Sequence, residues 1–592
     1  MLYKKLCLLL LAVAILASCK NNKNTAYDTK ENDERFDRFK SRFIEELWKV
    51  YPGWANGVGY HKYDSILVIP DGNSRQNELN FAKAYLDSLR NFKIAKLSAH
   101  NQIDYRLIEN QLKSTEWNIR QFKQWQWDPS MYNVGESFAL LLTENYAPLE
   151  NRLKSFAAKL NKVEAYYAAA KENINQPSIP HTELAIAQNR GSLDIFGAML
   201  EDSLKKVNLP ETEKQTIRAN ANKAISAIQQ YVNWLEKDVR PGLVEGKTAR
   251  SFRIEKELFD EKFQFDIQSG YTAEEVYNKA VKRKEELHTE MAKLANQLWP
   301  KYFANQPKPQ VNLALIRKVI DTLSTTHAHR DSFQLSVEKQ LPELVKFIND
   351  KNLLYLDPKK PLVVRQTPDY MAGFSVASIN SPGPYDKEAN TYYNVGSLKD
   401  YTPEMAESHL REYNKYTLQI INIHEAIPGH YTQLVYSNQS PSLIKSIFGN
   451  GAMVEGWAVY TERMMLEEGY GNNSPEMWLM YYKWHLRAVC NTILDYSIHV
   501  KNMSEKDALD LMIREAFQQE AEAKGKWRRA TLSQVQLCSY FTGYTEIYDF
   551  REELKKKQGD KFNLKNFHEK FLSYGSAPVK YIRELMMEEL KN

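Results

Sequence analysis

The segment AEEVYNKAVKRKEELHTEMAKLANQLW, residues 273–299, repeats apolar residues at i, i+3, i+4 and i+7, the period of an amphipathic helix. The same period recurs in the segments 36–51, 152–174 and 217–239. Turn-forming residues interrupt these helical segments at YPGWANGVG, PSIP, RPGLVEG, NQPKPQ and DPKKP without forming a long linker. The sequence therefore predicts a mainly α protein, either one helical domain or two closely packed lobes.

Residues 362–397 depart from this helical pattern. They are rich in β-branched and aromatic residues and are interrupted by S-P-G-P, which indicates a few short strands joined by turns. Helical periodicity resumes in residues 402–426, where Thr402 and Pro403 form a plausible N-cap and N1 pair. We therefore expect a small β-element just before the helix that ends in a histidine motif.

The overall composition is typical of a soluble globular protein. The chain has 592 residues, of which 43% are hydrophobic and 26% are charged. The formal net charge of +5 is small beside 79 basic and 74 acidic residues, and no long basic tract is interleaved with aromatic residues. These features argue against a nucleic-acid-binding protein.

The first nineteen residues form a targeting segment. The basic MLYKK is followed by the apolar LCLLLLAVAIL and by LASC, which resembles a bacterial lipoprotein signal with lipid attached to Cys19. An ordinary secretory signal that contains a cysteine is the alternative. Residues 20–32 are polar and are expected to form a flexible tether. We therefore expect an exported protein that the lipid anchors to the bacterial cell envelope, at its periplasmic or surface face, with no membrane-spanning helix.

Two cysteines remain beyond the targeting segment, Cys490 and Cys538. Both lie in apolar, helix-like surroundings. A disulfide between them is possible in an oxidising compartment, and two buried free thiols fit the sequence equally well.

The ten residues HEAIPGHYTQ, 424–433, resemble a zinc-protease motif with two extra residues. In H-E-x-x-H the histidines occupy i and i+4, and the glutamate acts as general base. Here a regular helix would separate His424 and His430 by ~120° around the axis and ~9 Å along it. Pro428 lacks the N–H needed to continue the helix, and Gly429 accepts unusual backbone angles. We therefore expect a bulge that brings both histidines to one face beside Glu425.

A hydrolytic zinc site uses three protein ligands and leaves one position open. The segment GAMVEGWAVYTERM, 451–464, supplies Glu455 as third ligand, and Glu462 lies two turns further along the same face. Glu462 is expected to orient a ligating histidine through its second ring nitrogen. Structural histidines and solvated glutamates are the alternative, but burying these groups in apolar helices without a metal is costly. The sequence therefore predicts one zinc ion, with another divalent metal left open.

Two further pairs of side chains are candidates for the site. Tyr540 and Tyr544 stand four residues apart on a predicted helix, and a tyrosine hydroxyl can stabilise an oxyanion. Asp495 and His499 have the i, i+4 spacing of a hydrogen-bonded pair. Most of the 35 tyrosines must be packing residues, so spacing alone assigns neither pair a role.

Four motifs occur in a fixed order: HEAIPGHYTQ, then VEGWAVYTE, then R-x7-D-x3-H at Arg487, Asp495 and His499, then QLCSYFTG at 536–543. Together they resemble the bacterial family catalogued as domain of unknown function 885. That family is similar to gluzincin metallopeptidases of the thimet oligopeptidase and helical carboxypeptidase type. The likeness extends over about residues 33–590.

The resemblance implies a helical domain, residues 33–592, with an N-terminal lobe over 33–355 and a catalytic lobe over 356–592 around a deep cleft. It implies zinc ligation by the two histidines and Glu455, a general base at Glu425, and an oxyanion contact from Tyr540, with His499 as a possible second donor. The strand at 392–396 matches one that pairs with an extended substrate. The residues expected to contact substrate are Tyr392, Tyr393, Arg487 and Tyr544. The acidic residue expected before Arg529 is replaced by Lys526.

The function expected from these observations is hydrolysis of peptide bonds by an exported, membrane-anchored zinc metallopeptidase, with a peptide or oligopeptide as substrate. A zinc amidase or esterase acting on a non-peptide substrate is one alternative. A lipoprotein that binds peptides or a partner through an inactive site is another. The sequence leaves open whether cleavage is internal or terminal, and whether the protein is a monomer or a dimer.

Overall fold

The computed structural model describes residues 29–304, 306–360, 362–367, 377–386, 390–399, 401–440 and 442–590. The predicted signal peptide and Cys19 lie outside these residues. The described chain is mainly helical and contains a three-stranded sheet just before the histidine motif, which confirms the predicted fold class. The predicted deep cleft stays a prediction.

The first described helix covers residues 29–50, so the last four residues of the predicted tether are helical. Glu31, Asp33 and Glu34 stand near its beginning, where negative charge is favourable to the helix dipole. Phe36, Phe39 and other apolar residues on one face are buried. Because these apolar residues are buried, the helix begins further toward the N-terminus than the polar composition of residues 20–32 indicated.

The helices before the sheet are α2 (Pro52–Gly57), α3 (Gly72–Leu89), α4 (Ala99–Trp117), α5 (Gln124–Trp127), α6 (Gly135–Thr143), α7 (Leu149–Leu160), α8 (Val163–Asn173), α9 (Ile179–Phe196), α10 (Ala198–Lys205), α11 (Glu211–Trp234), α12 (Glu255–Asp266), α13 (Ala273–Phe303), α14 (Asn312–Leu323) and α15 (Phe333–Lys351). The strands are β1 (Leu362–Gln366), β2 (Ala377–Asn380) and β3 (Thr391–Val395). The helices after the sheet are α16 (Pro403–Glu412), α17 (Lys415–Glu425), α18 (His430–Asn438), α19 (Leu443–Ile447), α20 (Gly451–Glu467), α21 (Pro475–His499), α22 (Glu505–Asp510), α23 (Glu520–Leu532), α24 (Ser539–Gln558), α25 (Leu564–Ser573) and α26 (Val579–Glu589).

Local sequence explains where these helices begin and end. The α13 helix starts at a capping box in which the Thr272 hydroxyl accepts from the Glu275 N–H and the Glu275 carboxylate accepts from the Thr272 N–H. Its apolar stripe packs along α21. The predicted helix over 402–426 is instead two helices, because the Asn414 side chain caps a new start by accepting from two backbone N–H groups. The predicted helix over 152–174 likewise divides into α7 and α8.

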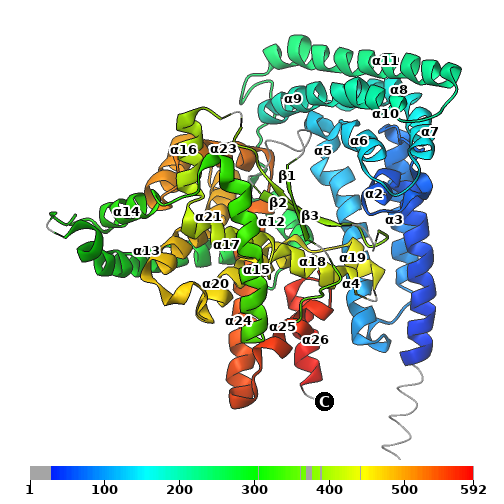
Figure 1. Ribbon diagram of the computed structural model, residues 1–592. Coiled ribbons are helices and arrows are strands. Elements are labelled where there is room, and N and C mark those ends of the chain that lie inside the picture. Colours follow the sequence, from blue (N-terminus) through cyan, green and yellow to red (C-terminus); the bar gives the residue numbers. More distant parts are fainter. Residues whose placement is uncertain are drawn as a thin grey trace, which may run out of the picture.

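Strand β3 is the centre of the small sheet. It pairs in parallel with β1 and antiparallel with β2, so the order is β1-β3-β2. The sheet lies among the helices in the middle of the molecule (Figure 1). Strand β2 contacts α17, whereas β1 contacts α15. The sheet therefore rests against the helix that ends at His424 and Glu425.

The buried apolar side chains form two clusters. The larger one runs from Phe36 to Trp127 and again from Phe252 to Met586. The smaller one lies between Tyr132 and Leu235, and its helices α6–α11 gather at one end of the molecule (Figure 1). The N-terminal helices therefore share a core with the C-terminal half, while the predicted lobe boundary at residue 355 stays a prediction.

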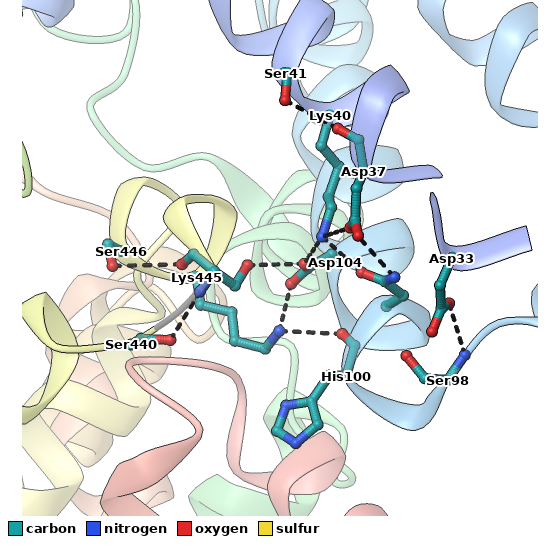
Figure 2. Close-up of polar contacts among 12 residues, drawn as sticks. Asp33, Asp37, Lys40, Ser41, Ser98, His100, Asp104, Ser440, Lys445 and Ser446 are labelled. Atoms are coloured by element: carbon teal, nitrogen blue, oxygen red, sulfur yellow. Dashed lines mark hydrogen bonds and ion pairs between the residues drawn. The ribbon is translucent and has the colours of Figure 1, made fainter. Parts of the chain in front are cut away.

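A buried charge cluster fixes the N-terminal helices to the C-terminal half (Figure 2). Asp104 on α4 accepts from Lys40 at 2.7 Å and from Lys445 on α19, and Lys445 also donates to the carbonyl of His100 at 3.0 Å. Asp104 and Lys445 are each only 1% exposed. Burial opposes ionisation of Asp104, but the charges of Lys445 and Lys40 hold its pKa below the ordinary value. The carboxylate is therefore charged at neutral pH and joins three distant segments.

We expect Asp104→Ala to lower the free energy of unfolding by about 3–5 kcal/mol, because it leaves the Lys445 ammonium buried without its anion. Chemical denaturation of the folded protein measures this loss. Asp350→Ala removes an exposed i, i+4 partner of Lys346 and is the matched control, with an expected change of about 0.5 kcal/mol or less. Equal losses in the two variants would contradict a special role for the buried cluster.

Other sequence predictions concern the thiols and the membrane. Cys490 and Cys538 are both buried and both free, which decides between the two alternatives for these cysteines. Among the described residues, no helix combines the length and the apolar character needed to cross a membrane.

Candidate metal centre

The histidine motif is divided between two helices. Helix α17 ends at Glu425 and α18 begins at His430, so the chain forms a helix break where the sequence predicted a bulge. Across the break the Gly429 N–H donates to the carbonyl of Ile423 at 3.0 Å. A Cβ atom at Gly429 would lie 1.8 Å from the His424 carbonyl oxygen, so only glycine permits this approach. The break brings the two histidines together.

The ring nitrogens of His424 and His430 converge on one carboxylate oxygen. Oε2 of Glu455 lies 3.8 Å from Nε2 of His424 and 3.4 Å from Nε2 of His430. The two imidazole rings are nearly perpendicular, with centroids 4.8 Å apart. One ligand atom from each residue falls within 4.8 Å of the others. The three predicted ligands therefore lie together, while their role as ligands stays a prediction.

Glu462 contacts His424, one of the two histidines in the motif, while its predicted orienting role stays a prediction. Nδ1 of His424 lies 2.6 Å from Oε1 of Glu462, which also accepts from the indole N–H of Trp484 at 3.1 Å. Because an indole N–H only donates, Oε1 accepts from Trp484, and an ionised Glu462 would also accept a hydrogen from Nδ1 of His424. The Nε2 lone pair of His424 then points toward Glu455, as a metal ligand requires.

The donor set fits a divalent metal of the zinc type. Oε2 of Glu455 is buried without a hydrogen bond, and so is Nδ1 of His430. Burial lowers the pKa of His424 to about 4, so its imidazole is neutral at pH 7 and able to coordinate. Burial alone would raise the pKa of Glu455, but nearby His430 lowers it. The neighbouring Glu455 raises the pKa of His430 against the effect of burial, so this imidazole loses a proton when it binds a metal. Two imidazoles and one carboxylate are ligands that zinc accepts, with a position left for water.

A second cluster of possible ligands, Glu285, His288 and Glu515, is satisfied by the protein itself. Nε2 of His288 donates to the backbone carbonyl of Glu515 at 2.8 Å. Lys284 pairs with both carboxylates of the cluster. These groups leave no converging free donor, so the histidine motif is the better candidate.

Glu425 is the last residue of α17 and directly follows His424. It is partly buried, and burial raises the pKa of its carboxyl group, against the effect of the two histidines. The charge of Glu425 raises the pKa values of His424 and His430, and the charge of Glu455 raises the pKa of Glu425. A carboxylate in this position, not used in any hydrogen bond that fixes it elsewhere, is suited to accept a proton at the centre.

Tyr540, at the start of α24, lies beside the metal centre together with Arg529. The Tyr540 hydroxyl accepts from Nη2 of Arg529 at 3.1 Å, and the same nitrogen donates to Gln536 at 2.8 Å. Burial raises the pKa of Tyr540 to about 12, and the charge of Glu455 adds to this effect. Since the oxygen of Tyr540 accepts from Arg529, its own O–H remains free to donate to a substrate.

Helices α20 and α24 cross at two glycines, each adjacent to candidate site residues. A Cβ atom at Gly543 would lie 1.7 Å from the carbonyl oxygen of Ala452 and 2.8 Å from Cα of Gly456. This close backbone approach sets the distance between Glu455, which precedes Gly456, and Tyr540, which lies one turn before Gly543. The sequence shows Gly543 only as the last residue of the motif QLCSYFTG.

His499 and Asp495 do not reach the metal centre. Nε2 of His499 donates to the carbonyls of Ala530 and Ser533 at 3.0 and 3.1 Å, and burial lowers its pKa to about 4. Asp495 lies 3.7 Å from His499 and instead accepts from the N–H groups of Val535 and Leu537. Both side chains hold the segment 530–538 that leads into α24. The expected oxyanion contact of His499 and its orientation by Asp495 are therefore corrected to a positioning role.

Arg487 and Tyr544 are engaged within the protein. Arg487 forms ion pairs with Glu412 and Glu522, which hold its guanidinium between two carboxylates. The Tyr544 hydroxyl accepts from Arg463 at 2.9 Å, and the ring is 4% exposed. The predicted substrate contacts of these two residues are not supported.

The predicted substrate strand also needs correction. Both edges of β3 are occupied, by β1 over residues 391–395 and by β2 over residues 392–395, so its backbone cannot pair with a substrate. Tyr393 is fully buried and its hydroxyl donates to Asn422 at 2.7 Å, which supports α17. The Tyr392 ring is covered by Arg365 at 3.8 Å. Only a strand at the edge of a sheet can pair with the backbone of a substrate. Of the two edge strands, β2 is the one that contacts α17.

Sequence reasoning missed several residues around the centre. Arg529 and Lys526 appeared only as a departure from a motif, and Trp484 was not considered. The indole of Trp457, within the EGWA motif, donates to the carbonyl of Pro428 at 2.9 Å and ties the helix break to α20. A buried tryptophan needs an acceptor, and the proline-containing break offers carbonyls that no helix uses, so this pairing had a detectable signal.

Comparison with known proteins gives a family and a fold. A family model described as "Bacterial protein of unknown function (DUF885)" matches residues 52–586. A solved structure described as a "putative lipoprotein of unknown function" from Shewanella oneidensis is 57% identical, with a TM-score of 0.85, covering 93% of this chain and 99% of that chain. A "putative lipoprotein" from Colwellia psychrerythraea, 16% identical, covers 95% and 99% with a TM-score of 0.75 and shares the fold. No curated protein matches the chain.

Proposed function

This chain belongs to the bacterial family DUF885, whose description gives no function, and from its own site we propose that it is a zinc-dependent metallopeptidase. The observation that carries the proposal is the convergence of Nε2 of His424, Nε2 of His430 and Oε2 of Glu455, beside the carboxylate of Glu425. Three such ligands with an adjacent general base are the arrangement of hydrolytic zinc sites.

The side chains divide the chemical tasks between them. Zinc held by His424, His430 and Glu455 would polarise the attacking water and the scissile carbonyl. Glu425 accepts a proton from the attacking water and delivers it to the leaving amine. The free O–H of Tyr540 donates to the oxyanion that forms on the carbonyl. Glu462 keeps the Nε2 lone pair of His424 directed at the metal.

The substrate is proposed to lie along β2. Among the described residues, one edge of β2 pairs with no other strand, and an extended peptide can add to this edge through backbone hydrogen bonds, in the way that edge strands bind peptides. The contact between β2 and α17 brings such a peptide toward His424 and Glu425. Backbone pairing explains how one site can accept peptides of different sequence, because it does not depend on side chains.

The protein is proposed to act outside the cytoplasm, on a lipid anchor. The support is the sequence up to LASC with Cys19, and two similar structures whose descriptions read "putative lipoprotein". An anchor of this kind leaves the helical domain in the aqueous phase. Mass spectrometry of the protein purified from its bacterium tests this, since a lipidated N-terminal cysteine is expected and an unmodified Lys20 start would contradict it.

Peptide cleavage is tested on the purified, zinc-loaded protein with a complex peptide mixture read by mass spectrometry. New peptide termini that are absent after treatment with a chelator, and that return when zinc is restored, support the proposal. A parallel panel of esters and N-acyl compounds tests the non-peptide alternative. A folded, zinc-containing protein that cleaves none of the peptides overturns the proposed peptidase activity.

We expect Glu462→Gln to weaken zinc binding by about 10–100-fold, because Gln is a weaker acceptor for Nδ1 of His424. Competition with a chromogenic chelator measures the affinity. Glu467→Gln, on the same helix and paired with Arg463, is the control and is expected to leave the zinc affinity unchanged. Unchanged affinity in Glu462→Gln would remove Glu462 from the metal centre.

A further inference from the structure

Helix α23 presents two cationic side chains on the side of the metal centre. Lys526 and Arg529 are three residues apart and therefore share one face of the helix. Both charges interact with Glu455. The charge of Arg529 lowers the pKa of Glu455, and the charge of Glu455 raises the pKa of Lys526. Neither has an ion-pair partner within 4.0 Å among the described residues. Lys526 is buried, and a buried cation without a paired anion is unusual and indicates a site for one.

Of the two cations, Lys526 is in the more unusual environment for a charged side chain. Its side chain is 8% exposed, although a lysine ammonium is rarely buried without a partner. Burial, together with the charges of Arg487 and Arg529, lowers the pKa of Lys526 to about 7. Glu522 and Glu455 oppose this lowering only in part. An anion bound beside Lys526 would stabilise its charged form.

The neighbouring charges do not supply that anion. Glu412 binds Lys483 at 2.9 Å and Arg487, and Glu522 binds Arg487, so these two carboxylates are already shared between two cations. Glu455 directs its free oxygen to the two histidines and would be occupied by a metal. Glu522 and Glu455 therefore compensate the cationic pair on α23 only in part, and no carboxylate of the described residues lies within ion-pair distance of it.

Arg529 is held with part of its guanidinium available. Its Nη2 donates to Gln536 and to the Tyr540 hydroxyl, and these contacts fix the guanidinium beside the residue proposed to bind the oxyanion. The side chain is exposed, and its other N–H groups have no partner among the described residues. A planar guanidinium fixed in this way can bind a carboxylate through two hydrogen bonds.

We propose that Arg529 and Lys526 form a subsite that binds a carboxylate of the peptide substrate beside the metal centre. This inference rests on the proposed peptidase function and specifies its substrate. A carboxylate reaches the subsite either as the C-terminus of a peptide, which makes the enzyme a carboxypeptidase, or as an Asp or Glu side chain, which makes it selective for acidic sequences. Arg529 and Lys526 would bind a carboxylate from either source.

The test measures binding to the zinc-loaded Glu425→Gln protein, so that it does not depend on turnover. Isothermal titration compares a short peptide with its C-terminal amide, and a second peptide that contains Glu with its Gln counterpart. We expect one acid to bind about tenfold to a hundredfold more tightly than its neutral counterpart, as a charge-assisted hydrogen bond predicts. Equal affinity within both pairs overturns the carboxylate subsite.

Substitutions identify the residues responsible for the preference. Arg529→Gln and Lys526→Gln are each expected to abolish most of the preference for the acid, and Lys526→Gln is expected to leave binding of the neutral peptide unchanged. Lys526→Gln leaves the Tyr540 contact intact, so it separates the loss of charge from the displacement of Tyr540. Arg528→Gln, an exposed neighbour on α23, is the matched control and should retain the preference. A preference that survives in both subsite variants overturns the assignment.

Cleavage assays separate this inference from the proposed function. A wild-type protein that cleaves acid and neutral peptides at the same rate is a peptidase without the subsite, which overturns the inference alone. A wild-type protein that cleaves no peptide, while the Glu425→Gln protein prefers acids, retains the subsite and refutes the peptidase. If carboxylate binding accompanies cleavage, loss of Arg529 or Lys526 is expected to raise KM more than it lowers kcat.

Discussion

Glu425→Gln is expected to lower peptide hydrolysis by about a hundredfold to ten-thousandfold and to leave one zinc ion bound. Gln has nearly the same shape as Glu, so the end of α17 and the positions of both histidines should not change. Gln cannot accept a proton from the attacking water, and this is the step that the carboxylate supplies. Steady-state rates and elemental analysis of the same preparation measure the two properties.

Two comparisons make the Glu425 experiment decisive. His430→Ala removes a predicted ligand and is expected to lose zinc and activity together. If Glu425→Gln also loses zinc, Glu425 is a ligand or a structural residue, and the proposed mechanism is wrong. If Glu425→Gln keeps full activity, a different group accepts the proton.

Gly543→Ala is expected to destabilise the protein strongly. The added methyl group would lie 1.7 Å from the Ala452 carbonyl oxygen, and neither backbone can yield without separating α20 from α24. We expect a loss of about 3 kcal/mol or more in the free energy of unfolding, at the upper end for overpacked cores. Zinc affinity should fall as well, because Glu455 lies next to the crossing. Denaturation and zinc titration measure these effects.

Gly191→Ala is the matched control for Gly543→Ala. Gly191 lies within α9, is exposed, and would have nothing within 4 Å of an added Cβ atom. Alanine favours a helix over glycine by about 1 kcal/mol, so this variant should be slightly more stable. If both alanine variants were equally stable, the α20–α24 crossing would not limit the position of Glu455.

The sequence predicted those features that are encoded in residue type and local spacing. Helical periodicity predicted the mainly α class, and the β-rich composition of residues 362–397 predicted the small sheet. The chemistry of His424, His430, Glu455 and Glu462 predicted a cluster, and the structure brings these four side chains together. Pro428 and Gly429 marked the irregular backbone between the two histidines.

The features that escaped prediction depend on contacts between distant segments. Asp495 and His499 have the spacing of a pair, but each binds backbone groups more than thirty residues away, and backbone groups leave no signal in residue type. The central position of β3 depends on strand order, which three short strands do not specify. The ion pairs of Arg487 involve Glu412 and Glu522, which stand 75 and 35 residues away along the chain.

The segment 530–538 has a consequence for communication within the molecule. His181 on α9 lies 3.2 Å from the Leu532 carbonyl, next to the carbonyls that His499 holds from α21. Helix α9 belongs to the smaller core, so that core is in direct contact with the segment that positions Arg529 and Tyr540. The imidazole of His181 therefore links the smaller core to the segment that leads to the metal centre, in addition to the packing of α9 against α23.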